Sequence, residues 1–261
     1  MIKTKVIGRV FRQDEIADQI YDMWIETELA QGARPGQFVC VYTKNAAALL
    51  PRPISICEVN EEKTMLRLVY RTVGTGTNEF AAYHAGTEIS LLGPLGNGFP
   101  VEKAAGKRVF LIGGGIGIPP MLQLSKEIKK AGQAYCELSV LGYRNELFLN
   151  TDLEKYSQVY VATEDGSAGT KGTVLDAIKE KGLSGDVIFA CGPMLMLRAI
   201  KEYAAANNME AYISLEEHMA CGVGACLGCV CKTKNVDAHS HVHNSRICTD
   251  GPVYNAEEVE I

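Results

Sequence analysis

A short segment near the carboxyl end, CGVGACLGCVC at residues 221–231, holds four cysteines and three glycines. Cys221, Cys226 and Cys229 have the spacing C-x4-C-x2-C, and Cys248 follows after eighteen more residues. This is the spacing of plant-type [2Fe–2S] clusters, in which four thiolates hold two irons. Glycines between the ligands let backbone N–H groups turn toward the sulfurs. The segment therefore predicts an iron–sulfur cluster held by these four cysteines.

A zinc site with four cysteine ligands is the main alternative. Structural zinc sites usually show two close C-x2–4-C pairs, whereas Cys248 stands alone. Free thiols would be unusual at this density, and a Rieske centre would need two histidine ligands. Cys231 fits no ligand position, so it is either a packed thiol or a substitute for Cys229.

Three alternating histidines, His239, His241 and His243, lie between Cys229 and Cys248. On a strand they would share one face, and a metal role is conceivable. A solvated loop or hairpin is the interpretation that the sequence favours.

A second candidate site follows a hydrophobic strand in VFLIGGGIGIPP. The turn contains Gly113, Gly114, Gly115 and Gly117, and Pro119 suits the first turn of a helix, where an N–H has no partner. Bare backbone at a helix N-terminus can bind a pyrophosphate. The pattern is not a strict G-x-G-x-x-G, so a turn that serves only close strand–helix packing is the alternative.

Cys191, Gly192 and Pro193 end a later strand in FACGPMLM. Open α/β sheets bind ligands at the carboxyl ends of their strands, so we expect these residues beside the same dinucleotide. Taken alone, Cys191 fits a buried packing residue equally well.

Two stretches nearer the N-terminus could hold an anionic cofactor. RPIS at residues 52–55 begins a strand, and its arginine offers a planar fork for phosphate oxygens. VYRTVGTGT at residues 69–77 adds a second arginine, together with backbone N–H groups and threonine hydroxyls. An ordinary strand with surface arginines and a tight turn is the alternative.

The elements that would position these residues form three segments. Residues 1–100 contain short strands rich in β-branched residues and predict an antiparallel β-barrel or sandwich, with a helical interruption near 75–84. Residues 101–210 alternate strands with helices and predict an α/β domain with a parallel sheet. Residues 211–261 form a small C-terminal domain that carries the cysteines.

Composition limits the class of protein. The 261 residues are 47% hydrophobic with a formal net charge of −5, which argues against nucleic acid as the main partner. No stretch resembles the roughly 20 apolar residues of a membrane span, and the N-terminus lacks the apolar region of a signal peptide. We expect a soluble cytoplasmic protein, where clustered cysteines indicate metal or redox chemistry.

The motifs, taken in order, resemble those of the ferredoxin–NADP reductase superfamily and, within it, the electron-transfer subunits of dihydroorotate dehydrogenase B. The matching motifs are RPIS, VYR-x-VG-x-GT, GPLGNGF at 93–99, GGGIGIPP, CGP and the cysteine spacing, and they extend over nearly the whole chain. The resemblance implies a β-barrel that binds FAD, an α/β domain that binds NAD and a small [2Fe–2S] domain. The flavin site that it implies consists of Arg52, Pro53, Ile54, Ser55, Val69, Tyr70, Arg71, Gly76 and Thr77.

The resemblance also implies a function. Electrons from an FMN-containing dihydroorotate dehydrogenase subunit would pass through the [2Fe–2S] cluster and FAD to NAD+ in pyrimidine biosynthesis, in a heterotetramer of two copies of each subunit. No acid–base residue is expected, because the cofactors carry the chemistry. Two alternatives stay open: the small flavin and iron–sulfur subunit of an NAD(P)H–ferredoxin oxidoreductase or sulfide dehydrogenase, and a zinc-stabilised binding module.

The choice between NAD and NADP rests on charge. Arg144 could bind a 2′-phosphate, but Glu146 is close to it, and Glu164 and Asp165 follow the next strand. The acidic balance favours NAD.

Overall fold

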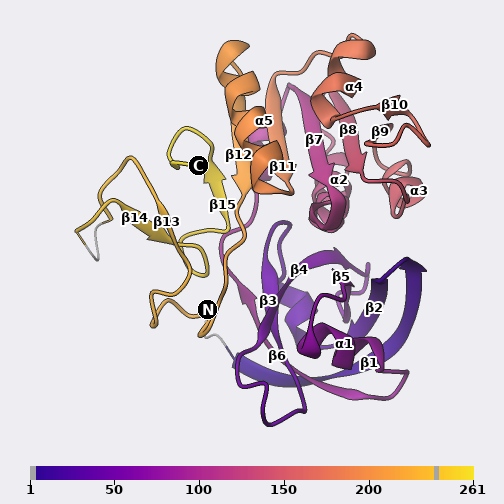
Figure 1. Ribbon diagram of the computed structural model, residues 1–261, viewed down its shortest axis with the longest axis vertical. Helices are drawn as coiled ribbons and strands as arrows, with labels where there is room; N and C mark the ends of the chain where they lie inside the picture. The colour runs from indigo at the N-terminus through magenta and orange to yellow at the C-terminus, as the bar shows by residue number, and fades with distance from the viewer. Residues whose placement is uncertain (1–3, 238–240) are drawn as a thin grey trace.

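A computed structural model describes residues 4–237 and 241–261 of the chain, in three parts. A β-barrel, an α/β domain with a central sheet, and a C-terminal segment beside both are visible in Figure 1. Within the described residues, no helix is long and apolar enough to cross a membrane.

The N-terminal part is a closed antiparallel barrel, as the sequence predicts, in the strand order β1-β2-β5-β4-β3-β6. Alternating side chains on each strand point inward and outward: Val39 and Val41 fill the barrel core, while Cys40 between them packs outside it. The predicted helical interruption is α1, which ends at Ala81. The elements are β1 (Thr4–Ala17), β2 (Ile20–Glu26), a 3-10 turn (Glu28–Gly32), β3 (Phe38–Tyr42), β4 (Arg52–Val59), β5 (Met65–Arg71), α1 (Thr75–Ala81) and β6 (Glu88–Leu95).

The central part is a seven-stranded sheet in the order β10-β9-β8-β7-β11-β12-β15, parallel except for β15 at one edge. Its strands are β7 (Arg108–Gly114), β8 (Cys136–Tyr143), β9 (Gln158–Thr163), β10 (Thr170–Lys171), β11 (Val187–Cys191), β12 (Glu210–Ser214) and β15 (Val253–Asn255). The connecting helices are α2 (Pro119–Ala131), α3 (Asn150–Leu153), α4 (Val174–Glu180) and α5 (Met194–Ala206), with 3-10 turns at Val101–Ala104 and Gly115–Gly117. The predicted parallel α/β domain is confirmed.

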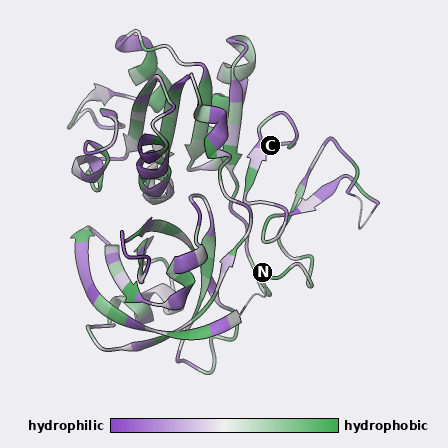
Figure 2. Cartoon of the chain, turned by 180° about the vertical axis from the view of Figure 1, so that it is seen from behind, coloured by the Kyte–Doolittle hydropathy of each residue, from purple (hydrophilic) through white to green (hydrophobic). Residues whose placement is uncertain are grey.

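Both faces of this sheet are covered, which explains the continuous apolar run of β7. Phe110 and Ile112 pack with residues of α4 and α5, while Val109 and Leu111 pack with residues of α2 and α3. The strands are accordingly hydrophobic through the middle of the sheet in Figure 2.

The C-terminal segment joins the other two parts. Its hairpin pairs β13 (Val230–Lys232) with β14 (Asn244–Arg246), in accord with the loop or hairpin favoured for this stretch. Asn97 at the end of the barrel donates from Nδ2 to the carbonyl of Asp250 at 2.8 Å. Strand β15 then adds to the edge of the parallel sheet beside β12. The segment is therefore fastened to both neighbouring domains.

Candidate functional site

The four cysteines predicted to hold a cluster lie together in two pairs. Cys221 and Cys226 are hydrogen-bond neighbours through their side chains, and so are Cys229 and Cys248. Within residues 4–237 and 241–261, no three His, Cys, Asp or Glu side chains converge as the ligands of a single metal ion would. Two thiol pairs suit two bridged irons, each with two protein ligands, better than one tetrahedral zinc. The donor set therefore fits a [2Fe–2S] cluster.

Backbone N–H groups of the cysteine loop point at the sulfurs, as the glycine content predicts. The N–H groups of Val223 and Ala225 donate to Cys221 Sγ at 3.4 and 3.3 Å, and that of Gly228 donates to Cys226 Sγ at 3.4 Å. Burial would raise the pKa of Cys221, but these donors and Cys226 outweigh it and lower the pKa to about 6. The loop is thus built to stabilise a thiolate.

Cys231 belongs to neither thiol pair, and the two described histidines of this stretch lie on the hairpin. Cys231 packs beside Tyr254, which hydrogen bonds to it. His241 and His243 are exposed at the turn of the hairpin, and His243 Nδ1 lies 2.9 Å from the carbonyl oxygen of Lys234. His239 lies outside the described residues.

The two stretches expected to hold FAD meet in the barrel. Residues 52–55 form the first half of β4, and the guanidinium of Arg52 lies against the backbone of Gly76 in the first turn of α1. A Cβ at Gly76 would lie 2.7 Å from Arg52 Cζ. A bare backbone beside an arginine forms a cradle suited to phosphate oxygens.

Three other residues expected at the flavin already have partners within the protein. Tyr70 donates from its hydroxyl to Gln13 Oε1 at 2.8 Å, and Val69 is buried against the α/β domain. The Thr77 hydroxyl accepts from the N–H groups of Val73 and Gly74 and so caps α1. Arg71, at the end of β5, is exposed toward the cleft described next.

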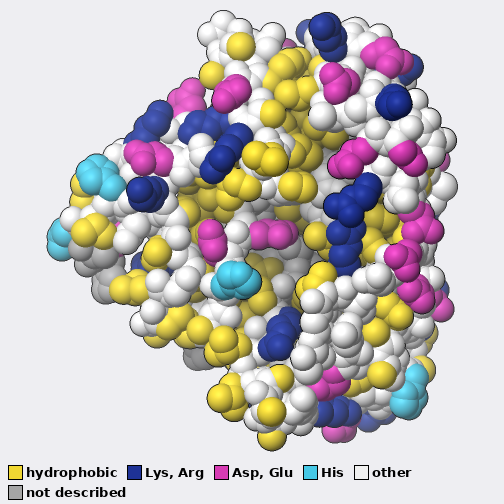
Figure 3. All heavy atoms as spheres, in the orientation of Figure 1, with side chains coloured by type: hydrophobic (Ala, Val, Ile, Leu, Met, Phe, Trp, Pro, Cys, Tyr) yellow, Lys and Arg dark blue, Asp and Glu magenta, His cyan; other side chains and the backbone are white. Residues whose placement is uncertain are grey.

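A cavity of about 680 Å³ lies at the carboxyl ends of the parallel strands, between the α/β domain and the barrel. Arg71, Gly114, Gly115 and Pro193 all line it. So do the hairpin residues 17–20, which sequence reasoning did not single out. Basic and acidic side chains gather along this junction in Figure 3. The size and the bare backbone suit a dinucleotide.

The four glycines of the β7 turn divide into two groups. A Cβ at Gly113 would lie 2.9 Å from the Ile118 backbone, and one at Gly117 would lie 2.5 Å from the nitrogen of Gly192. These two positions require glycine for close packing. Gly114 and Gly115 both line the cavity, but a Cβ at Gly114 would lie 2.6 Å from Met196 Sδ, whereas Gly115 has φ +51° with open space around it. The packing interpretation therefore applies to Gly113, Gly114 and Gly117, and the binding interpretation is supported at Gly115.

Cys191 is buried at the end of β11, in register with Gly113 of β7. Burial, with the nearby Glu216 carboxylate, raises the pKa of its thiol well above the ordinary value. Glu216 follows β12, and its side chain is exposed at the surface. The neighbouring protein atoms still remove part of the water around its carboxyl, and this desolvation raises its pKa too. An acidic residue at the carboxyl end of a parallel strand is a signal that could have identified Glu216 from sequence.

The cluster loop contacts β3, the strand next to the one expected to bind flavin. Cys40 of β3 is paired with Pro53 of β4, and a Cβ at Gly222 would lie 2.9 Å from Cys40 Sγ. Burial and the charges of Cys221 and Cys229 raise the pKa of Cys40 to about 12. Nothing in the sequence indicates this contact, because the two residues are far apart along the chain.

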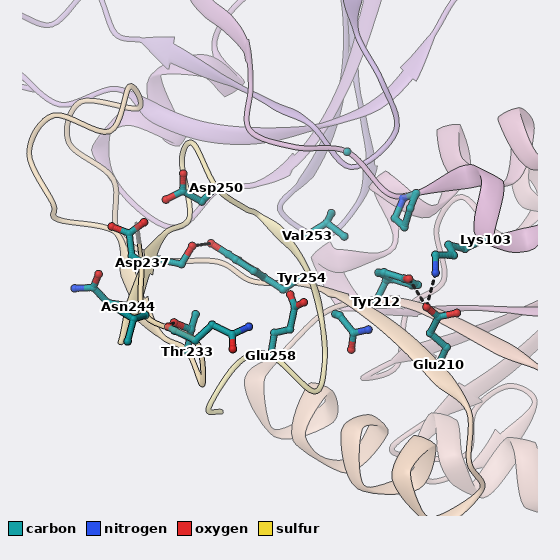
Figure 4. A pocket seen from close by; sticks show the side chains of 16 residues that line it. Lys103, Glu210, Tyr212, Thr233, Asp237, Asn244, Asp250, Val253, Tyr254 and Glu258 are labelled. Carbon is teal, nitrogen blue, oxygen red and sulfur yellow. Dashed lines mark hydrogen bonds and ion pairs between the residues drawn. The ribbon is translucent and has the colours of Figure 1, made fainter. Parts of the chain in front are cut away.

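A second cavity of about 640 Å³ separates the C-terminal hairpin from the sheet edge. Figure 4 shows Lys103 and Tyr212 directed at Glu210 on one side, and Tyr254 and Glu258 on the other. Lys103 Nζ lies 2.8 Å from Glu210 Oε1. The lining contains none of the predicted site residues.

Two family models match the chain. One is described as the iron–sulfur cluster binding domain of dihydroorotate dehydrogenase B and matches residues 216–260. The other is described as an oxidoreductase NAD-binding domain and matches residues 111–202. The two matches lie within residues 211–261 and 101–210, respectively.

Solved structures share the fold. A structure of the NADH-dependent reduced ferredoxin–NADP oxidoreductase is 29% identical, with a TM-score of 0.86 over 98% of this chain and 90% of that one. A ferredoxin NADP+ reductase from Neisseria gonorrhoeae with bound FAD and NADP is 15% identical, with a TM-score of 0.65 over 78% of this chain and 91% of that one.

Curated relatives extend over the whole length. The dihydroorotate dehydrogenase B (NAD(+)) electron transfer subunit of Geobacillus sp. (strain WCH70) is 42% identical over 255 residues, 96% of each chain. That of Listeria monocytogenes serovar 1/2a is 40% identical over 262 aligned positions, 100% of each chain. With the paired thiols and the dinucleotide cleft, these relationships place the chain in the family of dihydroorotate dehydrogenase B electron transfer subunits.

Proposed function

We propose that this chain carries electrons from an FMN-containing dihydroorotate dehydrogenase subunit to NAD+, in a heterotetramer of two copies of each subunit that serves pyrimidine biosynthesis. The names of its relatives support the partner and the acceptor. The [2Fe–2S] cluster exchanges single electrons and FAD exchanges one or two, so the pair can join a one-electron path to a two-electron acceptor.

The observation that carries this proposal is the position of Cys40. Its strand neighbour is Pro53 in the proposed flavin stretch, and its sulfur touches the loop that holds the cluster ligands. Opposite Cα atoms of paired antiparallel strands lie about 5 Å apart, so Cys40 is close to the flavin stretch on one side. On its other side, the Cys40 side chain contacts the cluster loop. With cofactors at these two sites, the path between them would be short and would pass the buried Cys40.

The residues of the barrel would bind and orient FAD. Arg52 and Arg71 supply positive charge, Gly76 supplies bare backbone, and Thr77 holds the turn in place by capping α1. Residues 53–55 form the adjoining, partly exposed strand surface, and the buried residues Val69 and Tyr70 support the barrel behind Arg71.

The α/β domain would hold NAD in the cavity at its strand ends. Gly115 leaves open space for the pyrophosphate, and Gly114 and Pro193 border the same cavity. Arg144, Glu146 and Glu164 line the cavity as well, so the acidic residues that favour NAD over NADP face the proposed ligand. Cys191 lies near the same sheet end, where its buried thiol packs beneath the cavity, and the exposed Glu216 lies close to it.

The partner is expected on the exposed side of the cluster loop. Val223 and Leu227, which flank the ligands Cys221 and Cys226, leave 41% and 53% of their surface exposed. Exposed apolar side chains beside a redox centre favour docking of another protein there.

The test is the isolated complex of this chain with its partner. Wild-type complex should reduce NAD+ with dihydroorotate, and Cys226→Ser should abolish that activity while NADH still reduces an artificial acceptor through FAD. Full dihydroorotate-dependent turnover in Cys226→Ser would contradict the proposed electron path.

One observation favours a second candidate. The likeness to the NADH-dependent reduced ferredoxin–NADP oxidoreductase suits the small subunit of an NAD(P)H–ferredoxin oxidoreductase. Purification from the native cell distinguishes the two, because a complex of the second kind would reduce ferredoxin and contain no dihydroorotate-oxidising subunit.

A further inference from the structure

Strand β4 has a backbone edge that the barrel leaves open, and the α/β domain fills it. The ladder between β4 and β3 ends at Ser55, opposite Phe38. Farther along, the N–H of Val59 donates to Gln123 Oε1 at 2.8 Å, and its carbonyl accepts from Lys126 Nζ at 3.0 Å. Gln123 and Lys126 belong to α2 and are only 3% and 8% exposed. A helix of one domain thus completes the hydrogen bonding of a strand in the other.

Charged side chains surround this contact. Arg67 of β5 binds both oxygens of Asp22 at 2.9 and 2.8 Å, and it contacts Glu58 at 3.1 Å and Asp152 at 3.0 Å. Lys126 reaches the other oxygen of Glu58 at 3.2 Å. Asp22, Glu58 and Arg67 are barrel residues, whereas Lys126 and Asp152 belong to the α/β domain. The carboxylate of Glu58 is therefore shared by a cation from each domain.

Apolar contacts already hold the two domains together. Cys57, Val69 and Leu122 pack in one buried cluster at this junction. Apolar burial is non-directional, whereas buried ion pairs add little net stability but demand a defined geometry. Burial would lower the pKa of Lys126, but Glu61 and Glu58 raise it above its ordinary value, so the charge persists.

Strand β4 carries a proposed cofactor stretch, and helix α2 follows another, near the same contact. Ser55 precedes Glu58 by three residues, about 10 Å along a strand. The glycine turn ends at Gly117, α2 begins at Pro119, and Gln123 lies four residues farther, about 6 Å along the helix. In Figure 1, α2 lies over β4 where the two domains meet. The proposed FAD and NAD stretches are thus linked through one strand, one helix and the residues that join them.

We propose that Glu58, Arg67, Gln123 and Lys126 form a clamp between barrel strands β4 and β5 and helix α2 that fixes the angle at which NADH meets FAD, with Lys126 as a positioning residue for their electron transfer. The inference rests on the proposed function in one respect, namely that NADH reduces FAD within this chain. Lys126 contacts neither cofactor stretch directly and acts through β4.

The decisive variant is Lys126→Met, which keeps the aliphatic stem and removes the ammonium. FAD-loaded full chain is mixed with NADH under anaerobic conditions, and flavin bleaching is followed by stopped flow. We expect the limiting rate to fall roughly ten- to a hundredfold, because misplacement of about 1 Å can cost that much, while the NADH dissociation constant changes less than about threefold. The long-wavelength charge-transfer absorbance of stacked nicotinamide and flavin should weaken in parallel.

The matched control is Lys130→Met, which removes an exposed charge from the same helix. It should retain the wild-type rate and absorbance. Lys126→Arg keeps a cation in reach of Glu58 and should recover most of the rate. Hydrogen exchange at β4 and α2, measured on the chain without NADH, should accelerate in Lys126→Met and not in Lys130→Met.

A wild-type limiting rate in well-folded Lys126→Met overturns the inference, as does a loss confined to NADH affinity. If Lys126→Met fails to fold, Gln123→Leu is tested instead, with the same measurements of rate, absorbance and hydrogen exchange. This variant removes the hydrogen bond to the N–H of Val59 without burying an unpaired charge. Failure of the wild-type chain to be reduced by NADH would instead refute the proposed function itself.

Discussion

The guanidinium of Arg52 occupies the space that a side chain at Gly76 would need. A Cβ at Gly76 would lie 2.7 Å from Arg52 Cζ and 3.0 Å from Nη2. Arg52 is also held from the other side, since its Nη1 donates to the carbonyl of Leu50. The two residues come from separate motifs, and their contact creates the phosphate cradle proposed for FAD.

Gly76→Ala is therefore expected to displace Arg52 and weaken FAD binding roughly ten- to a hundredfold, the effect of losing one charge-assisted hydrogen bond. The measurement is the FAD to protein ratio after purification, together with fluorescence titration of the apoprotein. Gly74→Ala is the matched control, because a Cβ at Gly74 meets nothing within 4 Å and the backbone there is extended. Equal FAD retention by both variants would contradict the cradle.

The pairing of thiols predicts which cysteines the cluster needs. Cys226→Ser should remove the visible absorption of the cluster together with its iron and acid-labile sulfide. Cys231→Ser should keep about two irons per chain, since Cys231 packs beside Tyr254 outside the two pairs. Iron loss in Cys231→Ser, with iron retained in Cys229→Ser, would show that Cys231 is the ligand and that Cys229 is not.

Contact between the cluster loop and the barrel makes Gly222 a sensitive position. Its φ of +68° disfavours any side chain, and an added Cβ would lie 2.9 Å from Cys40 Sγ. Gly222→Ala should lower cluster occupancy and shift the electron paramagnetic resonance spectrum of the reduced cluster. Gly228→Ala serves as control, because its nearest atom is 3.5 Å away and its φ is not positive. Comparable occupancy in the two variants would count against close docking of loop and barrel.

Much of this architecture could be predicted because its signals are local. The apolar run of β7, the glycines after it and the prolines of α2 lie within one short stretch, so strand, turn and helix follow from sequence order. The cysteine spacing is likewise a local signal, because the ligands and the residues between them belong to one loop. The N–H groups of those intervening residues donate to the sulfurs.

Contacts between distant segments could not be predicted in the same way. Strand β15 has only three residues, too few to show a period, yet it completes the sheet edge. Arg67 and Lys126 look like ordinary surface charges in sequence and become buried only when the barrel meets α2. Cys40 resembles a packing residue, because alternation places it outside the barrel without indicating that the cluster loop covers it.

Glu137 makes the stability of the fold depend on pH. It lies half-buried near the start of β8, where Ser125 Oγ donates to its Oε2 at 3.1 Å. Burial raises the pKa of this carboxyl from 4.5 to about 7, against weaker opposing effects of Ser125 and Lys129. Between these two values the folded chain holds a proton that the unfolded chain has lost. The free energy of unfolding should therefore fall as pH rises from 4.5 through 7 and then level off.

Replacing this carboxyl by an amide removes the dependence. Glu137→Gln should stabilise the protein at pH 8.5 by about 1.5 kcal/mol, a value reduced for partial solvent exposure, and should leave stability nearly unchanged at pH 5. Chemical unfolding at both pH values measures the difference, with the exposed Glu102→Gln as control. The gain at high pH should be present with and without FAD, because Glu137 belongs to β8 of the α/β domain and not to the barrel segments proposed to hold FAD. An equal gain at both pH values would mean that the amide improves packing and that the charge of Glu137 is not the cause.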